Sequence, residues 1–297
     1  MWYQQPGKIA SGFYMIGTAA NPVYLCRSEN EWILIEGGIG LNAPLILSQL
    51  KSILPDLSSL KHWFITHSHY DHCGAIEYLY PQFPSIKLYT SKEAIHNFRN
   101  ARYAQKVSQL NSSLIADQNI IHEPQLAGGL AELPFIQADE HACITTAGLD
   151  WLVIPTPGHS KCSLSFYNLS EKKLFVSDAF GEIVTTNKWF PLAFESMKLF
   201  MNSVSRLGAF DVDFIALGHH GIISGIDAAS AASFCLQSCS EFIEAVNEIR
   251  RTKGATYAKP WIIETYQRKV NNFIPEDIYH KSIEQLLQVL LNEDYFV

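Results

Sequence analysis

The sequence has no uninterrupted apolar run of the roughly 18 residues that a membrane-spanning helix requires. Residues 1–8 also lack the basic and apolar regions of a signal peptide. The six cysteines include no C-x-x-C pair, and scattered cysteines in a chain of this size are typical of reduced, mostly buried thiols. We therefore expect a cytoplasmic protein that does not associate with membranes.

Positive charge is scarce. The chain has 22 Lys and Arg against 29 Asp and Glu, a net charge of −7, which argues against direct binding of nucleic acid. It also disfavours an anionic substrate unless a local basic patch outweighs the overall field. Arg99, Arg102 and Lys106 could form such a patch, although charges at this spacing are also typical of the solvated face of a helix.

The composition, 47 % hydrophobic and 17 % charged over 297 residues, is typical of a folded protein with a large core. Helices are expected from Asn42 to Leu50, over 92–118 and over 195–207, the second opened by capping-box spacing from Thr90 to Glu93. Strands are expected at 23–26, 32–35, 63–65, 86–89, 151–154, 163–167, 174–176 and 213–217. Two groups of strands interleaved with helices predict an α/β protein with two sheets and helices outside them.

From residue 225 onward the pattern becomes helical. Leu236, Cys239, Phe242 and Val246 recur at helical spacing, and further helices are expected near Pro260 and from Pro275 to Leu291. We therefore divide the chain into a domain of residues 1–224 and a helical extension of residues 225–297. This extension covers the mouth of an active site, forms a dimer interface, or simply packs on the core.

The densest chemical motif lies directly after the expected strand at 63–65. His67, His69, Asp71 and His72 fall within six consecutive positions, where imidazoles and a carboxylate lose hydration and repel one another. A divalent metal between them removes both problems. The alternative is a polar loop with solvated histidines, but this density of ligand side chains favours a metal site.

Further ligands are expected at the ends of later strands, because one cluster cannot fill two coordination spheres. His159, Asp178 and His219 each follow an apolar run, in Thr-Pro-Gly-His, Ser-Asp-Ala and Gly-His-His contexts. A single histidine or aspartate at such a place is more often a cap or turn residue. Three together, downstream of a dense metal motif, favour ligands, with His220 as the alternative to His219.

These motifs, H-x-H-x-D-H followed by T-P-G-H, S-D and G-H, resemble the metallo-β-lactamase superfamily and its glyoxalase-II-like branch. The resemblance implies an αβ/βα sandwich, here with a C-terminal helical extension, that holds a dinuclear metal centre. It assigns His67, His69 and His159 to one metal ion and Asp71, His72 and His219 to the other. Asp178 would bridge the two ions.

A closer resemblance is to the 2-aminobenzoylacetyl-CoA thioesterases, the family of quinolone signal response proteins. It rests on residues 60–84, on Glu36-Gly37-Gly38, on Ser177 to Glu182, and on residues 273–275 with Ser282. The resemblance implies hydrolysis of an aroyl or β-keto acyl-CoA, in a protein that also binds a quorum-sensing transcription regulator independently of hydrolysis. The expected homodimer would make its contacts on the C-terminal helices, around Arg250 and Arg251.

The proposed ligands are all nitrogen or oxygen donors, which suit iron, manganese and zinc alike; the resemblance favours two ions of iron or zinc. A hydroxide held between two metal ions could attack a carbonyl at neutral pH, with Asp71 and Asp178 as the predicted catalytic carboxylates. A thioester suits this chemistry because a thiol with a pKa near 8.5 leaves with little acid assistance.

Four residues are predicted to contact the substrate: Tyr70, Glu182, His280 and Ser282. Tyr70 could stack on an aryl group, and Glu182 could meet a substrate amine or relay a proton. The alternatives are a glyoxalase-II-like thioesterase, a lactonase, a phosphodiesterase, or a regulatory effector whose partner binding needs no hydrolysis. Glutathione binding would need basic residues at the rim of the site, which the sequence does not clearly supply.

Overall fold

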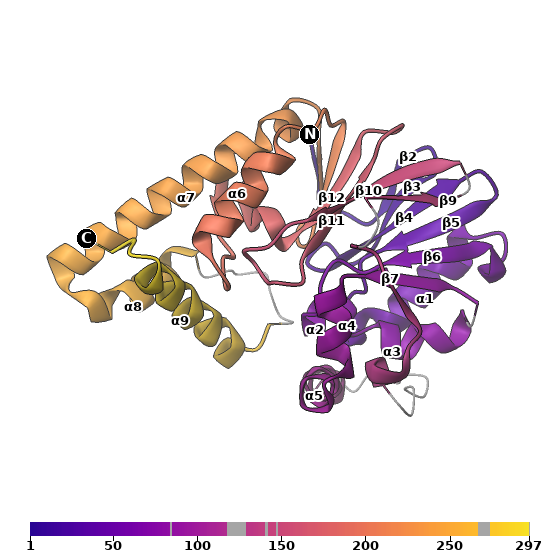
Figure 1. Cartoon of the computed structure of the whole chain (residues 1–297), viewed down its shortest axis with the longest axis horizontal. Helices are drawn as coiled ribbons and strands as arrows, with labels where there is room; N and C mark the ends of the chain where they lie inside the picture. The colour runs from indigo at the N-terminus through magenta and orange to yellow at the C-terminus, as the bar shows by residue number, and fades with distance from the viewer. Residues whose placement is uncertain (84, 118–128, 140–141, 147, 267–273, 297) are drawn as a thin grey trace.

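The computed structural model describes residues 1–83, 85–117, 129–139, 142–146, 148–266 and 274–296. Two seven-stranded sheets lie face to face, with helices on the outer face of each (Figure 1). This arrangement is the αβ/βα sandwich that the sequence predicts, and helices follow it at the C-terminal end. Residues 84 and 273, which belong to segments that carry the closer resemblance, lie outside the described residues.

The N-terminal sheet is ordered along the chain. Its strands are β2 (Gly7–Ala10), β3 (Phe13–Gly17), β4 (Pro22–Ser28), β5 (Glu31–Ile35), β6 (Leu60–Phe64), β7 (Lys87–Thr90) and β8 (Phe135–Gln137). Pairing is antiparallel up to β5 and parallel from β5 to β8. Parallel neighbours need crossover helices, and these are supplied by α1 (Ala43–Ile53), α3 (Ile76–Leu79), α4 (Lys92–Arg99) and α5 (Ala101–Asp117).

The second sheet has the order β1 (Trp2–Tyr3), β16 (Ile222–Ser224), β15 (Phe214–Leu217), β12 (Lys173–Ser177), β11 (Leu164–Asn168), β10 (Leu149–Pro155) and β9 (Cys143–Thr146). Its β12–β15 pair is parallel, and its other described pairs are antiparallel. Helices α6 (Met197–Leu207) and α7 (Ile226–Lys253) pack on its outer face, beside the hairpin of β13 (Glu182–Thr185) and β14 (Lys188–Phe190).

Aromatic side chains fill the space between the sheets. The ring of Phe64 stacks on that of Phe166 with centroids 4.9 Å apart, and Trp151 meets Phe64 edge-on. Strand alternation places Trp63 on the opposite face, against the helices of the first half. Each such ring contributes about 1.5–3 kcal/mol through burial, so this core fixes how the two sheets, and hence their loops, sit relative to each other.

The prediction of a single helix over 92–118 is wrong, because the structure has two helices, α4 and α5, with a break at Asn100. Asn100 takes an extended conformation with ψ of 107°, and its side chain accepts a hydrogen bond from the Tyr103 amide. The cap is also one residue later than predicted: Ser91, not Thr90, accepts from the amide of Ala94 at 3.1 Å. Both corrections reflect side chains competing for backbone groups, and residue 118 itself lies outside the described residues.

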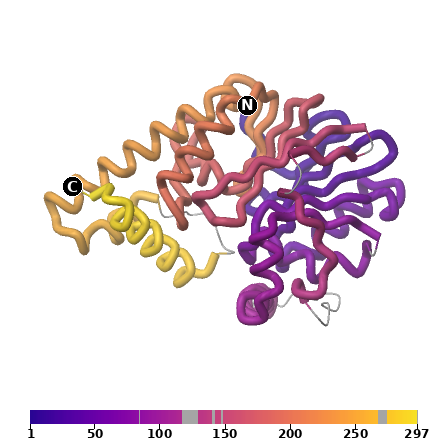
Figure 2. Tube along the Cα trace, viewed as in Figure 1, coloured from indigo at the N-terminus to yellow at the C-terminus, as the bar shows by residue number. Residues whose placement is uncertain are grey.

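The C-terminal helices project to one side of the sandwich (Figures 1 and 2). The 28-residue α7 is followed by α8 (Ala258–Tyr266) and α9 (Glu276–Asn292), and Pro260 lies in the first turn of α8, where proline is tolerated. All three share one apolar core with the second sheet, so the domain boundary at residue 224 stays a prediction. Among the described residues no helix is long and apolar enough to cross a membrane.

Candidate metal centre

The proposed ligands lie at the carboxyl ends of strands, at one edge of the sandwich. His67 and His69 follow β6, and the short helix α2 (Tyr70–Cys73) then supplies Asp71 and His72. From the second sheet, His159 follows β10, Asp178 follows β12 and His219 follows β15. Because the two sheets face each other, these loops meet, and the structure brings all seven side chains into two adjoining groups.

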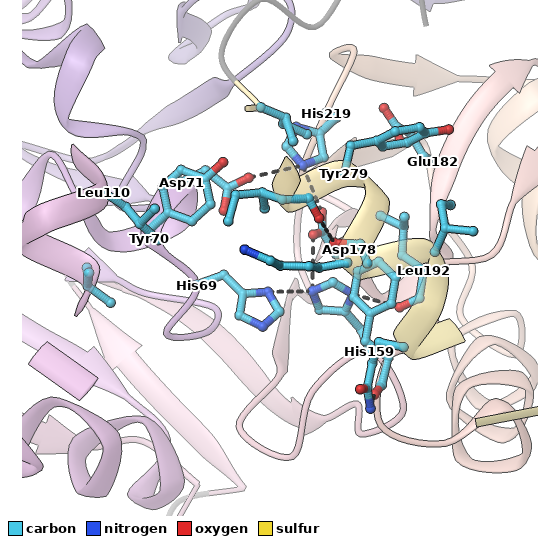
Figure 3. A pocket seen from close by; sticks show the side chains of 18 of the residues that line it. His69, Tyr70, Asp71, Leu110, His159, Asp178, Glu182, Leu192, His219 and Tyr279 are labelled. Atoms are coloured by element: carbon cyan, nitrogen blue, oxygen red, sulfur yellow. Dashed lines mark hydrogen bonds and ion pairs between the residues drawn. The ribbon is translucent and has the colours of Figure 1, made fainter. Parts of the chain in front are cut away.

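The first group consists of three imidazoles and a carboxylate. The Nδ1 atom of His69 lies 3.1 Å from Nε2 of His67 and 2.9 Å from Nε2 of His159 (Figure 3). Oδ2 of Asp178 lies 3.2 Å from Nε2 of His159 and 3.9 Å from Nε2 of His67. Four donor atoms therefore converge on one small volume, as the ligands of a metal ion do.

The second group consists of Asp71, His72 and His219. Oδ2 of Asp71 lies 3.6 Å from Nε2 of His72 and 3.7 Å from Nε2 of His219. Asp178 also reaches this group, with Oδ2 3.4 Å from Nε2 of His72 and Oδ1 3.5 Å from Nε2 of His219. The Asp178 carboxylate thus lies between the two groups, where the resemblance puts a bridging ligand.

Two observations test whether these residues fit metal ions. Nε2 of His72 and Oδ1 of Asp178 are buried and have no hydrogen-bond partner among the described residues, which is costly unless a cation contacts them. In addition, burial lowers the pKa of His67 well below its ordinary value and that of His69 to about 3. Neutral imidazoles carry the lone pairs that metal ions need. Although burial alone would lower it, the pKa of His72 is raised well above its ordinary value by the carboxylates of Asp178, Asp71 and Glu36, which attract a metal cation as they attract a proton. The donor set therefore fits metal ions.

The opposite edges of three imidazoles are held by hydrogen bonds. Nδ1 of His159 donates to the Leu192 carbonyl at 2.7 Å, and Nδ1 of His219 donates to the Ala20 carbonyl at 2.8 Å. Nδ1 of His72 lies 3.2 Å from Oε2 of the buried Glu36. These bonds leave Nε2 of each ring facing the centre. In the sequence Glu36 stood out only as part of the Glu36-Gly37-Gly38 motif of the closer resemblance, and main-chain carbonyls leave no signal in a sequence.

Glycines next to two of the ligands leave room that no other residue would. A Cβ at Gly218, which precedes His219, would lie 2.1 Å from Oδ1 of Asp178. A Cβ at Gly158, which precedes His159, would lie 2.2 Å from the backbone nitrogen of Phe200, and Gly158 has a φ of +130°. The Gly-His pairs are therefore explained by close backbone approach rather than by chain flexibility.

A cavity of about 630 Å³ opens onto both groups. Apolar and aromatic residues form most of its wall, including Val107 and Leu110 of α5, Phe194, and Ile278 and Ile283 of α9. Residues of α9 thus line this cavity together with residues of α5, and the role of the C-terminal extension as a cover of the active-site mouth stays a prediction.

Comparison with known proteins gives the same answer as the motifs. The sequence model of the metallo-β-lactamase superfamily matches residues 16–219. This chain belongs to the metallo-β-lactamase superfamily. A superfamily member of known structure, TTHA1429 from Thermus thermophilus, superposes with a TM-score of 0.65 over 97 % of this chain and 95 % of that one. Its sequence identity is 20 %, so this likeness shows the fold alone.

Two Bacillus subtilis proteins are related in sequence. The uncharacterized protein YobT is 32 % identical over 162 residues, which are 53 % of this chain and 60 % of YobT. The probable metallo-hydrolase YflN is 24 % identical over 176 residues, which are 57 % of this chain and 64 % of YflN. This chain therefore spans less than two thirds of either relative. Together with the histidine and aspartate cluster, superfamily membership supports a metal-dependent hydrolase, and neither relative's name specifies a thioesterase.

The cavity contains three of the four residues predicted to contact substrate. Tyr70, Glu182 and Ser282 line it, Ser282 with its hydroxyl donating to the Ile278 carbonyl at 3.0 Å. The structure does not bring His280 there: its ring lies 3.8 Å from Glu276 on a hollow outside the cavity. The reason is helical periodicity, since a residue two positions before Ser282 lies on the opposite face of α9.

His220, the alternative to His219, contacts Glu182. Its Nε2 lies 2.9 Å from Oε1 of Glu182, and neither group of ligand atoms includes it. This geometry favours His219 as the ligand. It also pairs Glu182, which lines the cavity (Figure 3), with an imidazole, a partnership that the sequence did not suggest.

Proposed function

We propose that this protein is a dinuclear metal-dependent thioesterase that acts on an aroyl or β-keto acyl thioester such as 2-aminobenzoylacetyl-CoA. The observation that carries the proposal is the largely apolar cavity that ends at both groups of ligand atoms, with Asp178 between them. An aryl acyl chain buried there would be held mainly by contact with aromatic and aliphatic walls. Its carbonyl would then face the proposed metal centre.

Bound metal ions, which we propose to be iron or zinc with manganese as an alternative, would polarise the carbonyl and supply a nucleophile at neutral pH. The protein's own residues set the geometry for that step. Asp178 offers carboxylate oxygens to both groups and Asp71 offers one to the second, while the walls exclude bulk water from the acyl chain. No strong acid needs to reach the leaving group, because a thiolate departs readily.

The thiol carrier would extend to the mouth of the cavity. Lys106 of α5 and Lys281 of α9 both line it, and they would offer cations to the phosphates of coenzyme A despite the net charge of −7. Glu276 at the same cavity weakens this field, as does Asp277, which pairs with Lys281 at 2.8 Å. Because the same lysines would also serve glutathione carboxylates, a glyoxalase-II-like thioesterase is the second candidate; a lactonase or phosphodiesterase has no comparable support.

The remaining expectations stay predictions. They are a cytoplasmic location, a homodimer, and a transcription-regulator partner that binds independently of hydrolysis. On α7, Arg251 pairs with Glu248 at an exposed site, whereas Arg250 stacks on the ring of Phe296 3.8 Å away. Arg251 is therefore the better placed of the two for contact with another molecule.

Thiol release from a panel of thioesters tests the proposal. We expect the metal-loaded protein to prefer 2-aminobenzoylacetyl-CoA over benzoyl-CoA and lactoyl-glutathione. Asp178→Asn should lower the rate by at least about 100-fold, because both metal positions lose a charged ligand. Asp211→Asn, a matched change at an exposed ion pair with Lys172, should leave it unchanged.

Preference for lactoyl-glutathione would favour the second candidate. Absence of turnover with every thioester would exclude a thioesterase and leave a lactonase, a phosphodiesterase or the effector hypothesis. In that case Asp178→Asn should still bind the partner, and loss of partner binding in the folded variant would argue against a separable role.

A further inference from the structure

The loop of residues 192–196, called here the 192–196 loop, lies between a proposed metal ligand and the C-terminal helix. On its inner side the Leu192 carbonyl accepts the Nδ1 proton of His159 at 2.7 Å (Figure 3). The ring of Phe194 packs against that of His159, with centroids 5.2 Å apart. The amides of Glu195 and Ser196 both donate to the Gly158 carbonyl, at 3.0 and 3.1 Å. The loop therefore holds both the imidazole and the backbone before it.

On its outer side the same loop is fastened to α9 by two side chains. Nε2 of Gln285 donates to the Phe194 carbonyl at 3.0 Å. The Glu293 carboxylate, just beyond the end of α9, accepts from the Ser196 hydroxyl and from the Lys198 amide at 3.1 Å. A carboxylate at the N-terminus of α6 is also favoured by the helix dipole. These contacts join positions that are distant along the chain, at 194–198 and 285–293.

We infer that Gln285 and Glu293 are positioning residues for the metal centre: by anchoring the 192–196 loop they fix the orientation of His159. A direct partner of a ligand imidazole is worth about 10- to 100-fold in metal affinity. Gln285 and Glu293 act indirectly, through the loop that contains Leu192, the hydrogen-bond partner of His159. We therefore expect them to have a smaller effect on metal affinity. The inference rests on the proposed metal site and not on the identity of the substrate.

This arrangement has a consequence for the cavity. Helix α9 lines the cavity on one face and holds the 192–196 loop with Gln285 and Glu293. A molecule that shifts α9, from inside the cavity or from outside, would therefore alter the ligand His159 as well as the entrance to the site.

The test uses the full chain with Gln285→Ala, Glu293→Ala and the milder Glu293→Gln, which keeps an acceptor oxygen. The matched control is Gln288→Ala, because Gln288 is exposed on the same helix and its side chain donates to Asn292, away from the loop. Zinc affinity is measured by chelator competition without substrate, since Gln285 also lines the cavity. Amide exchange of residues 192–198 is followed in the metal-free protein, and thermal midpoints report global stability.

We expect Gln285→Ala and Glu293→Ala each to lower the affinity for one of two zinc ions about three- to tenfold. The amides of Glu195 and Ser196 should exchange faster, and Gln288→Ala should match the wild type. Faster amide exchange with unchanged zinc affinity would overturn the inference. It would also be overturned if the affinities for both zinc ions fell equally and in proportion to a lowered thermal midpoint. A wild-type protein that binds no zinc, iron or manganese would overturn both this inference and the proposed function, whereas metal binding without thioesterase activity would overturn only the latter.

Discussion

Gly218→Ala is the sharpest steric test of the proposed bridging carboxylate. A Cβ at Gly218 would lie 2.1 Å from Oδ1 of Asp178 and 3.0 Å from Cε1 of His72. Ordinary contacts of this kind lie near about 3.5 Å, so the carboxylate would have to move by more than an ångström. Because Asp178 reaches both groups of ligand atoms, that shift should lower the affinity for both metal ions.

The expected size follows from the displacement. A misplacement of about 1 Å in a catalytic site costs on the order of 100-fold in rate, and overpacking costs about 1–3 kcal/mol in stability. The rate is measured as thiol release from 2-aminobenzoylacetyl-CoA, metal affinity by chelator competition, and stability by urea unfolding. These three readouts separate loss of the site from loss of the fold.

Gly225→Ala provides the matched control. A Cβ at Gly225 would meet no described atom within 4 Å, but the backbone there has a φ of +62°. Alanine in that conformation costs about 1–2 kcal/mol, so this variant should lose stability and keep its metal affinity. If Gly218→Ala also kept wild-type metal affinity and rate, Asp178 could not be held in the position between the two groups on which the proposed mechanism depends.

Two further predictions concern buried groups around the core of the first half. Glu36→Gln removes the charge that accepts from His72 and should lower the affinity of one metal ion about 10-fold, measured by chelator competition; an unchanged affinity would show that Glu36 does not orient the ring. Burial lowers the pKa of His62 from its ordinary 6.5, although Glu31 lies 3.4 Å away. The unfolded chain therefore takes up the proton more readily, and stability from this site should be lost as pH falls below about 6.5. Urea unfolding between about pH 5 and 8 should show this slope in the wild type, and His62→Gln should reduce it; an identical slope in both proteins would contradict the assignment.

The candidate metal centre could be predicted from the sequence because its proposed ligands occur in dense or repeated local contexts. Residues 67–72 place four donors in one loop, and His159, Asp178 and His219 each follow an apolar strand. These contexts identified the candidate ligands, whereas their division into two groups came from the resemblance to the superfamily. Where the signal depended on a single competing hydrogen bond, as at Asn100, the sequence prediction failed, because the periodicity of 92–118 outweighs one turn-forming side chain.

What the sequence could not supply is the set of contacts made by main-chain atoms or by residues distant along the chain. The carbonyls of Leu192 and Ala20 orient His159 and His219, yet any residue at those two positions has the same carbonyl. Gln285 on α9 looks in the sequence like any polar residue of an amphipathic helix, and so does its control Gln288. Only the fold distinguishes them, by placing one beside the Phe194 carbonyl and the other beside Asn292 on its own helix. Residue type and local context thus indicate which side chains are the candidate ligands, whereas the fold determines how those side chains are oriented.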